Sequence, residues 1–173
     1  IPASAFEGDT ALEKIDLTKV LSLGSKSFYG CTSLSFEDLQ LPNLKTLGQN
    51  AFYGVKVKKI SNLGKITSIP DGNYKNSLGV NEEYLESFTL SDTITTIPAY
   101  LLYSCKNVSE FNANWENITS IGKNAFDGCS SLVIEELSMP SLTTLGIRTF
   151  STVKIGRITD LGNITTTPSG NYS

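Results

Sequence analysis

Short runs of alternating apolar and polar residues recur along the whole chain, and they come in two kinds. The first kind places apolar residues such as Leu85, Phe88 and Leu90 around polar ones, which predicts a short strand with two outward positions between inward ones. The second kind is rich in Thr and Ile, and its β-branched residues favour a second strand that the following Gly or Pro ends. The second kind reads KITSIP at 65–70, TITTIP at 93–98, NITSIG at 117–122 and SLTTLG at 141–146.

A repeated unit connects the second kind of run to the next run of the first kind. It reads IGKNAFDGCSSL at 121–132, and it recurs as LGSKSFYGCTSL at 23–34, LGQNAFYGVKV at 47–57, LGIRTFSTVKI at 145–155 and IPASAFEGDTAL at 1–12. A single unit cannot bury its own apolar face, so a period of roughly 20 to 50 residues indicates a solenoid of stacked units. We therefore predict a mainly β solenoid of short parallel strands, connected by turns or short 3-10 helical turns.

One aromatic position recurs in each unit and predicts a column that fills the middle of the solenoid. Its members are 22 to 28 residues apart, which gives about seven units. The polar segment 75–83, KNSLGVNEE, follows the fourth member, and we expect it to protrude as a loop. The predicted column consists of Phe6, Phe28, Phe52, Tyr74, Leu102, Phe126, Phe150 and Tyr172.

The units form a larger repeat of 98 residues, because residues 25–74 match residues 123–172 at this constant offset. We divide the single solenoid domain, residues 1–173, into a first copy, about 1–98, and a second copy, about 99–173. Both ends of the sequence fall inside a unit, so we expect a piece of a longer array. Open parallel edges favour end-to-end self-association of such a piece.

The composition of the chain limits which partners and which kinds of catalytic or metal site it can have. The net charge is -3 with acids and bases interspersed, which argues against nucleic acid as a partner, and no apolar run approaches the roughly 20 residues that insert into a membrane. The chain contains no His, which excludes Ser/His/Asp and Cys/His catalytic sites and the usual zinc sites. Cys31, Cys105 and Cys129 are far apart, so we interpret them as small buried thiols, with a disulfide or a reactive thiol as the alternative. We predict no cofactor and no metal site.

Three short motifs belong to the repeat: Ala-Phe-Asp-Gly-Cys at 125–129, Leu-Ser-Met-Pro at 137–140 and Leu-Thr-Thr-Leu-Gly at 142–146. Together they resemble the BspA-like leucine-rich repeats of bacterial and protist surface proteins. The resemblance covers nearly the whole chain, although the units around Tyr74 and Tyr172 lack the Ala-Phe pair. It implies a right-handed leucine-rich-repeat solenoid at the cell surface or secreted, used for adhesion or host contact, and it implies no catalytic residues.

The outward positions of the first strands define a broad face that we predict to bind an extracellular protein or glycan. Smaller polar residues such as Ser87 also belong to the outward positions. The alternative is a structural spacer without a ligand of its own. Its outward charges would only form weak ion pairs between rungs, the successive turns of the solenoid. The predicted ligand-binding face comprises Glu13, Lys14, Glu37, Asp38, Lys58, Lys59, Glu86, Glu110, Glu135, Glu136 and Arg157.

Two pairs of adjacent acids raise the question of a glycosidase, which needs two carboxylates about 5 to 10 Å apart. Glu37 with Asp38 and Glu135 with Glu136 are four rungs apart, or about 20 Å at the usual strand spacing. That distance is too long for one active site. We therefore predict that the chain is not an enzyme, and that an enzyme would require two carboxylates facing each other across a pocket.

Overall fold

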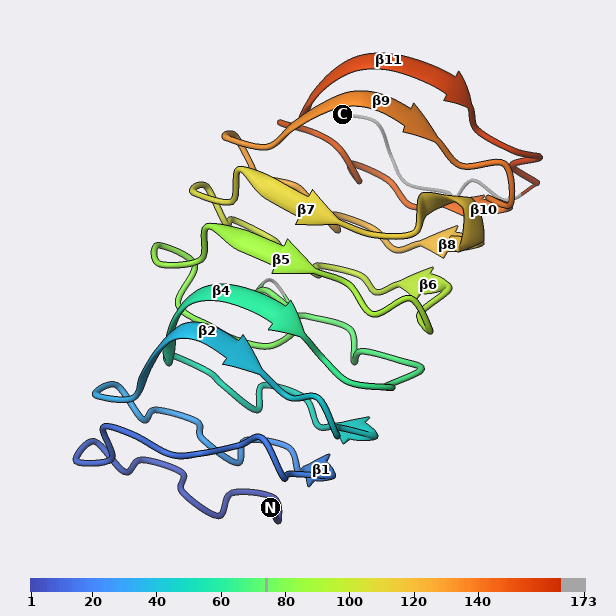
Figure 1. Ribbon diagram of the computed structural model, residues 1–173. Coiled ribbons are helices and arrows are strands. Elements are labelled where there is room, and N and C mark those ends of the chain that lie inside the picture. Colours follow the sequence, from blue (N-terminus) through green and yellow to red (C-terminus); the bar gives the residue numbers. More distant parts are fainter. Residues whose placement is uncertain (74, 166–173) are drawn as a thin grey trace.

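The computed structural model describes residues 1–73 and 75–165 as a solenoid of stacked turns. One side carries the longer strands, β2 (Ser35–Gln40), β4 (Lys56–Asn62), β5 (Ser87–Thr89), β7 (Glu110–Asn112), β9 (Val133–Ser138) and β11 (Lys154–Asp160) (Figure 1). The other side carries two-residue strands, β1 (Ser22–Leu23), β3 (Thr46–Leu47), β6 (Thr96–Ile97), β8 (Ser120–Ile121) and β10 (Thr144–Leu145). Every strand pair in the described residues is parallel, which confirms the predicted mainly β solenoid.

The longer strands follow the predicted pattern of two outward positions between inward ones. In β4, Val57 and Ile60 are fully buried, whereas Lys58 and Lys59 between them are exposed. The Thr-rich runs also form the predicted second strands at β6, β8 and β10. The run at 65–70 is different, because it forms no strand among the described residues.

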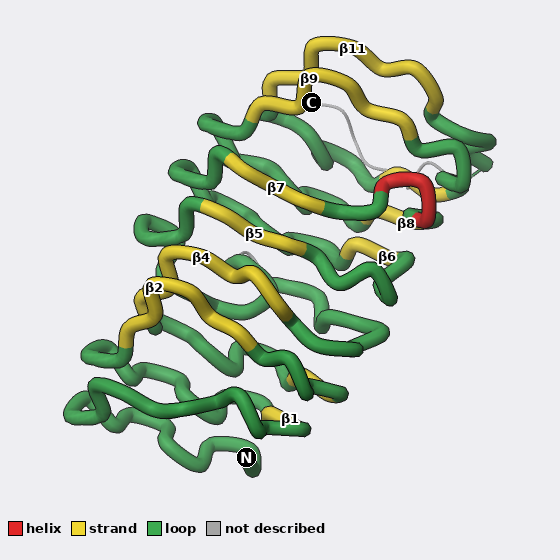
Figure 2. The backbone as a smooth tube through the Cα atoms, viewed as in Figure 1, coloured by secondary structure: helices red, strands yellow, loops and turns green. Residues whose placement is uncertain are grey.

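Both sheets are interrupted, but at different places. The longer strands fall into a four-stranded sheet, β2-β4-β5-β7, and a separate pair, β9-β11. The short strands fall into the pair β1-β3 and the three-stranded β6-β8-β10. After β7 the chain turns into η1 (Trp115–Asn117), the one helical segment of the described residues (Figure 2). The centroid of the Trp115 ring lies 5.4 Å from that of Phe111 and 6.2 Å from that of Phe126. Trp115 therefore fills the core between β7 and β9, where the longer strands no longer pair.

The aromatic column fills the core at both ends of the solenoid. The rings of Phe6 and Phe28 stack at 5.3 Å, those of Phe28 and Phe52 at 5.6 Å, and those of Phe126 and Phe150 at 5.4 Å. These near-parallel contacts repeat because stacked rungs place the same residue one above the next.

Between Phe52 and Leu102 the described core contains Leu78, which is 1% exposed. The Phe52 amide donates to the Leu78 carbonyl at 3.0 Å, so Leu78 lies directly next to Phe52 in the stack. Tyr74 and Tyr172, the residues assigned to the column from the sequence, lie outside the described residues.

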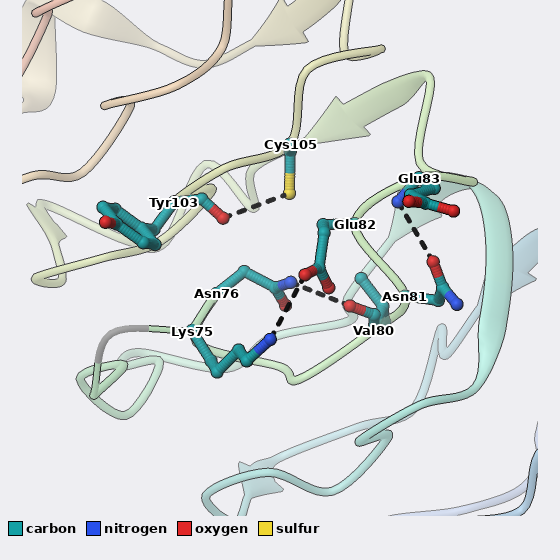
Figure 3. A network of polar contacts seen from close by, with 8 residues as sticks. All are labelled: Lys75, Asn76, Val80, Asn81, Glu82, Glu83, Tyr103 and Cys105. Carbon is teal, nitrogen blue, oxygen red and sulfur yellow. Dashed lines mark hydrogen bonds and ion pairs between the residues drawn. The ribbon is translucent and has the colours of Figure 1, made fainter.

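The prediction that residues 75–83 protrude as a loop is wrong. Residues 76–80 are buried and form the turn of this rung, and Figure 3 shows how the segment folds back on itself. The Asn76 amide donates to the Val80 carbonyl at 2.8 Å, and the Lys75 ammonium reaches the Glu82 carboxylate at 3.3 Å (Figure 3). The sequence misled because Asn-Ser-Leu-Gly-Val at 76–80 is a worn copy of Asn-Ala-Phe-Tyr-Gly-Val at 50–55. The residues that lengthen this rung therefore precede the turn.

Glycine is required where one rung lies directly on the previous one. A Cβ atom at Gly48 would lie 2.1 Å from the backbone nitrogen of Ser25, and one at Gly146 would lie 2.3 Å from that of Lys123. No side chain fits at such distances without displacing backbone. The glycines at this position, Gly24, Gly48, Gly122 and Gly146, thus permit the close stacking of the rungs.

The larger repeat is visible in the strands themselves. Adding 98 to the bounds of β1, β2, β3 and β4 gives the bounds of β8, β9, β10 and β11. The register irregularity in the β2-β4 pair also recurs in the β9-β11 pair, where Ser61 and Thr159 are the extra residues. Sequence similarity at this offset therefore reflects the same local backbone, including its bulge.

Candidate binding face

The outward surface of the longer strands, which we call the front face, carries all the residues that the sequence assigned to ligand binding. Each of these side chains is exposed, and most stand on the strands β2, β4, β7, β9 and β11. Glu86 immediately precedes β5, and Glu13 and Lys14 lie before the first strand. The exposed set is Glu13, Lys14, Glu37, Asp38, Lys58, Lys59, Glu86, Glu110, Glu135, Glu136 and Arg157.

Charged side chains of neighbouring rungs form one row across the first copy. The Lys58 ammonium lies 3.9 Å from a carboxylate oxygen of Glu37 on one side and 3.9 Å from one of Glu86 on the other. Both distances exceed those of N–H···O hydrogen bonds, about 2.7 to 3.2 Å. Lys58 thus forms two ion pairs but leaves the hydrogen-bonding capacity of both carboxylates unused.

A second row runs beside the first, because Asp38 pairs with Lys59, Lys59 with Ser87 and Ser87 with Glu110 in the strand register. Ser87 corrects the sequence expectation of an exposed outward residue, since it is only 7% exposed. Its hydroxyl donates to Glu110 at 3.2 Å and lies beneath that side chain.

Both acids of this row accept side-chain hydrogen bonds. Asn112 donates to the Glu110 carboxylate at 2.8 Å, and this bond, with the Ser87 hydroxyl and the nearby Lys59 charge, lowers the pKa of Glu110 below its ordinary value. Asp38 accepts in a similar way from Gln40 and Ser61 at 2.8 Å each. Each acid of the second row thus has two hydrogen-bond donors within the chain, in contrast with Glu37 and Glu86 of the first row.

A hollow of about 440 Å³ opens over the first row at the beginning of the strands. The Tyr84 ring forms part of its wall and is 46% exposed, and the Lys56 ammonium lies over that ring, 5.5 Å from the centroid. We call this feature the hollow, and its charged and aromatic lining consists of Phe36, Glu37, Lys56, Lys58, Glu83, Tyr84 and Glu86.

The sequence interpretation missed half of this lining. Lys56 and Tyr84 occupy the outward position two residues before Lys58 and Glu86, at the edge of the strand where the alternation was not continued. Extending the alternation by one step would have found both. Phe36 is only partly buried, with its ring edge-on to that of Phe52 at 6.4 Å between centroids.

The second copy carries the same acids in a different arrangement. Gly156 occupies the place of Lys58, so the first row has no cation there. Arg157, the counterpart of Lys59, donates to Glu136 at 2.5 Å. The cation of the second copy therefore lies in the second row. It donates a direct hydrogen bond to Glu136, which is the counterpart of Asp38 in the first copy.

The hollow meets part of the condition stated above for a glycosidase. Glu37 and Glu86 flank it, and since both lie 3.9 Å from one ammonium they are at most twice that distance apart. The side chains are 93% and 57% exposed, however, and a carboxyl that stays protonated at neutral pH usually needs an apolar enclosure. The geometry offers two solvated acceptors and a cation.

The three cysteines are free and buried, as the sequence predicted. Burial is the main cause that raises the pKa of the Cys129 thiol to about 12, and it also raises the pKa of Cys105 well above the ordinary value. The Cys129 sulfur donates to the Leu102 carbonyl at 3.1 Å. These thiols are packing groups of the core and are poor nucleophiles.

The described part of the chain contains neither a metal-binding cluster nor a membrane-spanning helix. Residues 1–73 and 75–165 contain no group of three or more Cys, Asp or Glu side chains arranged to hold a metal ion. Within the same ranges no helix is both long and apolar enough to cross a bilayer.

Stacked parallel strands with two outward residues between buried leucines define the fold as a leucine-rich-repeat solenoid. The family described as BspA type Leucine rich repeat region matches residues 1–82 and 80–173, with six copies of the repeat, and the chain belongs to this family. Such solenoids are generally non-catalytic repeat scaffolds for protein binding or structure, and proteins with these repeats are typically extracellular or at the cell surface. No curated protein and no solved structure matches the chain.

Proposed function

We propose that this chain is a cell-surface or secreted adhesion module that binds a partner protein through the front face of the first copy, without a covalent step. The observation that carries the proposal is the row Glu37, Lys58 and Glu86, whose carboxylates are charged, exposed and not hydrogen-bonded to Lys58. Such groups gain charge-assisted hydrogen bonds when a partner supplies donors. A pure spacer has no need of them.

The shape of the front face favours a protein over a glycan as the partner. It is a broad surface of short strands with one open hollow, and protein interfaces are built from many modest contacts over such areas. The exposed ring in the hollow, Tyr84, already lies beneath the Lys56 ammonium. A sugar that stacked on that face of the ring would have to displace the cation.

The test is a binding screen of the chain against extracellular-matrix and mucin proteins, with a glycan array beside it. A variant with reversed charges at Glu37 and Glu86, the two acids of the first row, serves as the control for the front face. A saturable protein ligand that the variant loses would support the proposal. Binding only to the glycan array would replace the protein partner by a sugar, and silence on both panels would favour the structural spacer.

A further inference from the structure

The chemistry of the hollow also indicates what kind of group a partner presents to it. We propose that the hollow binds an arginine side chain carried on an exposed segment of the partner protein. This inference rests on the proposed function and deepens it, because it names the anchoring group. Three features support it: the charge balance of the lining, its unused acceptors, and the arginine–acid contact that the second copy makes within the chain.

The charge balance of the hollow favours a cation. Its lining contains three carboxylates, Glu37, Glu83 and Glu86, but only two ammonium groups, Lys56 and Lys58. An anionic ligand would meet an excess of negative charge, whereas a cation would neutralise it.

The two lysines of the hollow already occupy the places that a cation prefers. Lys56 lies over the Tyr84 ring at 5.5 Å, and Lys58 lies between Glu37 and Glu86 at 3.9 Å from each. Lys58 donates no hydrogen bond to Glu37 or Glu86, so the oxygen atoms of both carboxylates remain able to accept one. A guanidinium has five donors in a planar fork and can reach a carboxylate with two parallel bonds, whereas an ammonium acts as a point charge. Arginine therefore fits the lining better than lysine does.

The second copy shows an arginine–acid contact made within the chain, in the second row. Arg157 donates to Glu136 at 2.5 Å on the front face, so an arginine does bind a front-face acid at hydrogen-bond distance there. In the first copy the cognate position holds Lys59, and the row beside it keeps two carboxylates without such a donor. We infer that the partner supplies to the first copy what Arg157 supplies to the second.

The test uses the full chain labelled with nitrogen-15 and a blocked pentapeptide of sequence GSRGS as the probe. Titration should cause saturable amide shifts at 35–37, 56–58 and 83–86, with a dissociation constant in the millimolar range, roughly 1 to 10 mM. The peptide GSKGS should bind more weakly, and GSQGS, which carries no charge, should cause no saturable shift. Equal shifts with GSQGS, or shifts spread over both copies, would overturn the proposal.

Matched variants separate the hollow from general acidity. The double change Glu37→Gln and Glu86→Gln should weaken GSRGS binding at least about threefold, because it removes both charged acceptors. Glu135→Gln with Glu136→Gln removes the same charge from the second copy and should leave the affinity unchanged. Lys58→Gln should tighten binding, since it removes the competing cation. Equal weakening by both double variants would overturn the proposal.

The experiments distinguish failure of the arginine proposal from failure of the adhesion proposal. A partner protein that binds the front face while GSRGS does not bind the hollow would remove the arginine proposal and leave the adhesion proposal standing. Binding of GSRGS at the hollow together with silence of the protein screen would do the reverse.

Discussion

The two copies of the 98-residue repeat share a backbone and differ in what they present to solvent. β2 and β4 have the same length, register and bulge as β9 and β11. Both pairs end in the same turn, in which Asn62 accepts from the Gly64 amide at 2.8 Å and Asp160 accepts from the Gly162 amide at 2.7 Å. The inward positions and the turns thus specify the scaffold, independently of the outward charges.

The outward charges, by contrast, are rearranged between the copies. In the first copy Lys58 stands between two acids at ion-pair distance, and in the second copy Gly156 replaces it while Arg157 binds Glu136 directly. Two faces on one scaffold can therefore differ in which charged groups remain open to further hydrogen bonds.

The largest expected effect is in the shared core. Phe28 and its counterpart Phe126 are both 0% exposed and each stacks on a neighbouring ring. Phe28→Ala and Phe126→Ala should each lower the free energy of unfolding by roughly 3 to 5 kcal/mol, measured by urea denaturation. A near-neutral result for either would remove the aromatic column as a common core.

The next effect appears at alkaline pH. The Cys129 thiol has its pKa raised from 9.0 to about 12, so the folded chain keeps a proton that the unfolded chain releases. This contribution is fully present below pH 9 and is lost at about 1.4 kcal/mol per pH unit as the pH rises toward 12.

The control for the thiol is Cys129→Ala, which should flatten the pH dependence of unfolding over that window. Its counterpart Cys31 also has its pKa raised by burial, so Cys31→Ala should act in the same direction. An unchanged slope in both variants would show that the buried thiols ionise normally in the folded chain.

The close stacking of the rungs predicts a third effect. Gly48→Ala and its counterpart Gly146→Ala place a Cβ 2.1 and 2.3 Å from backbone of the previous rung, and each should cost roughly 1 to 3 kcal/mol in thermal or urea unfolding. Gly54, whose Cβ would meet nothing within 4 Å, isolates the conformational cost of its φ of +79°. If Gly48→Ala were no worse than Gly54→Ala, the rungs would not be in the contact described.

The smallest effects concern the surface charges that differ between the copies. Lys58→Ala and Arg157→Ala should each change the free energy of unfolding by less than about 1 kcal/mol, because exposed ion pairs contribute little. Arg157→Ala should cost more of the two, since Arg157 makes a direct hydrogen bond. Measurement at low and high salt checks the assignment, because the difference should shrink as salt screens the charges.

The sequence predicted what depends on local repetition. Buried leucines around pairs of outward residues identified the front strands, and the offset of 98 identified equivalent elements to the residue. The sequence failed to identify the turn at 76–80, which lacks the aromatic residue of the motif and is buried. This turn keeps only Asn76, Gly79 and Val80 of the motif, and its composition alone cannot separate a buried turn from a loop.

The binding face was predicted residue by residue, but the hollow within it was not. Whether Glu37 and Glu86 share one ammonium depends on which rungs stack, and the extra residues between β4 and β5 concealed that register. The role of Tyr84 depends on the same register. The distances between side chains on different rungs therefore had to come from the structure, whereas the identity of the outward positions did not.

The most direct test of the account measures how a partner protein from the binding screen interacts with the two double variants of the acids. Glu37→Gln with Glu86→Gln alters the first copy, and Glu135→Gln with Glu136→Gln alters the second, with the same change in charge. The account predicts that the first variant loses most of its affinity and that the second binds like the unaltered chain. Equal affinity of both variants, or a greater loss in the second, would contradict the claim that the first copy carries the binding site.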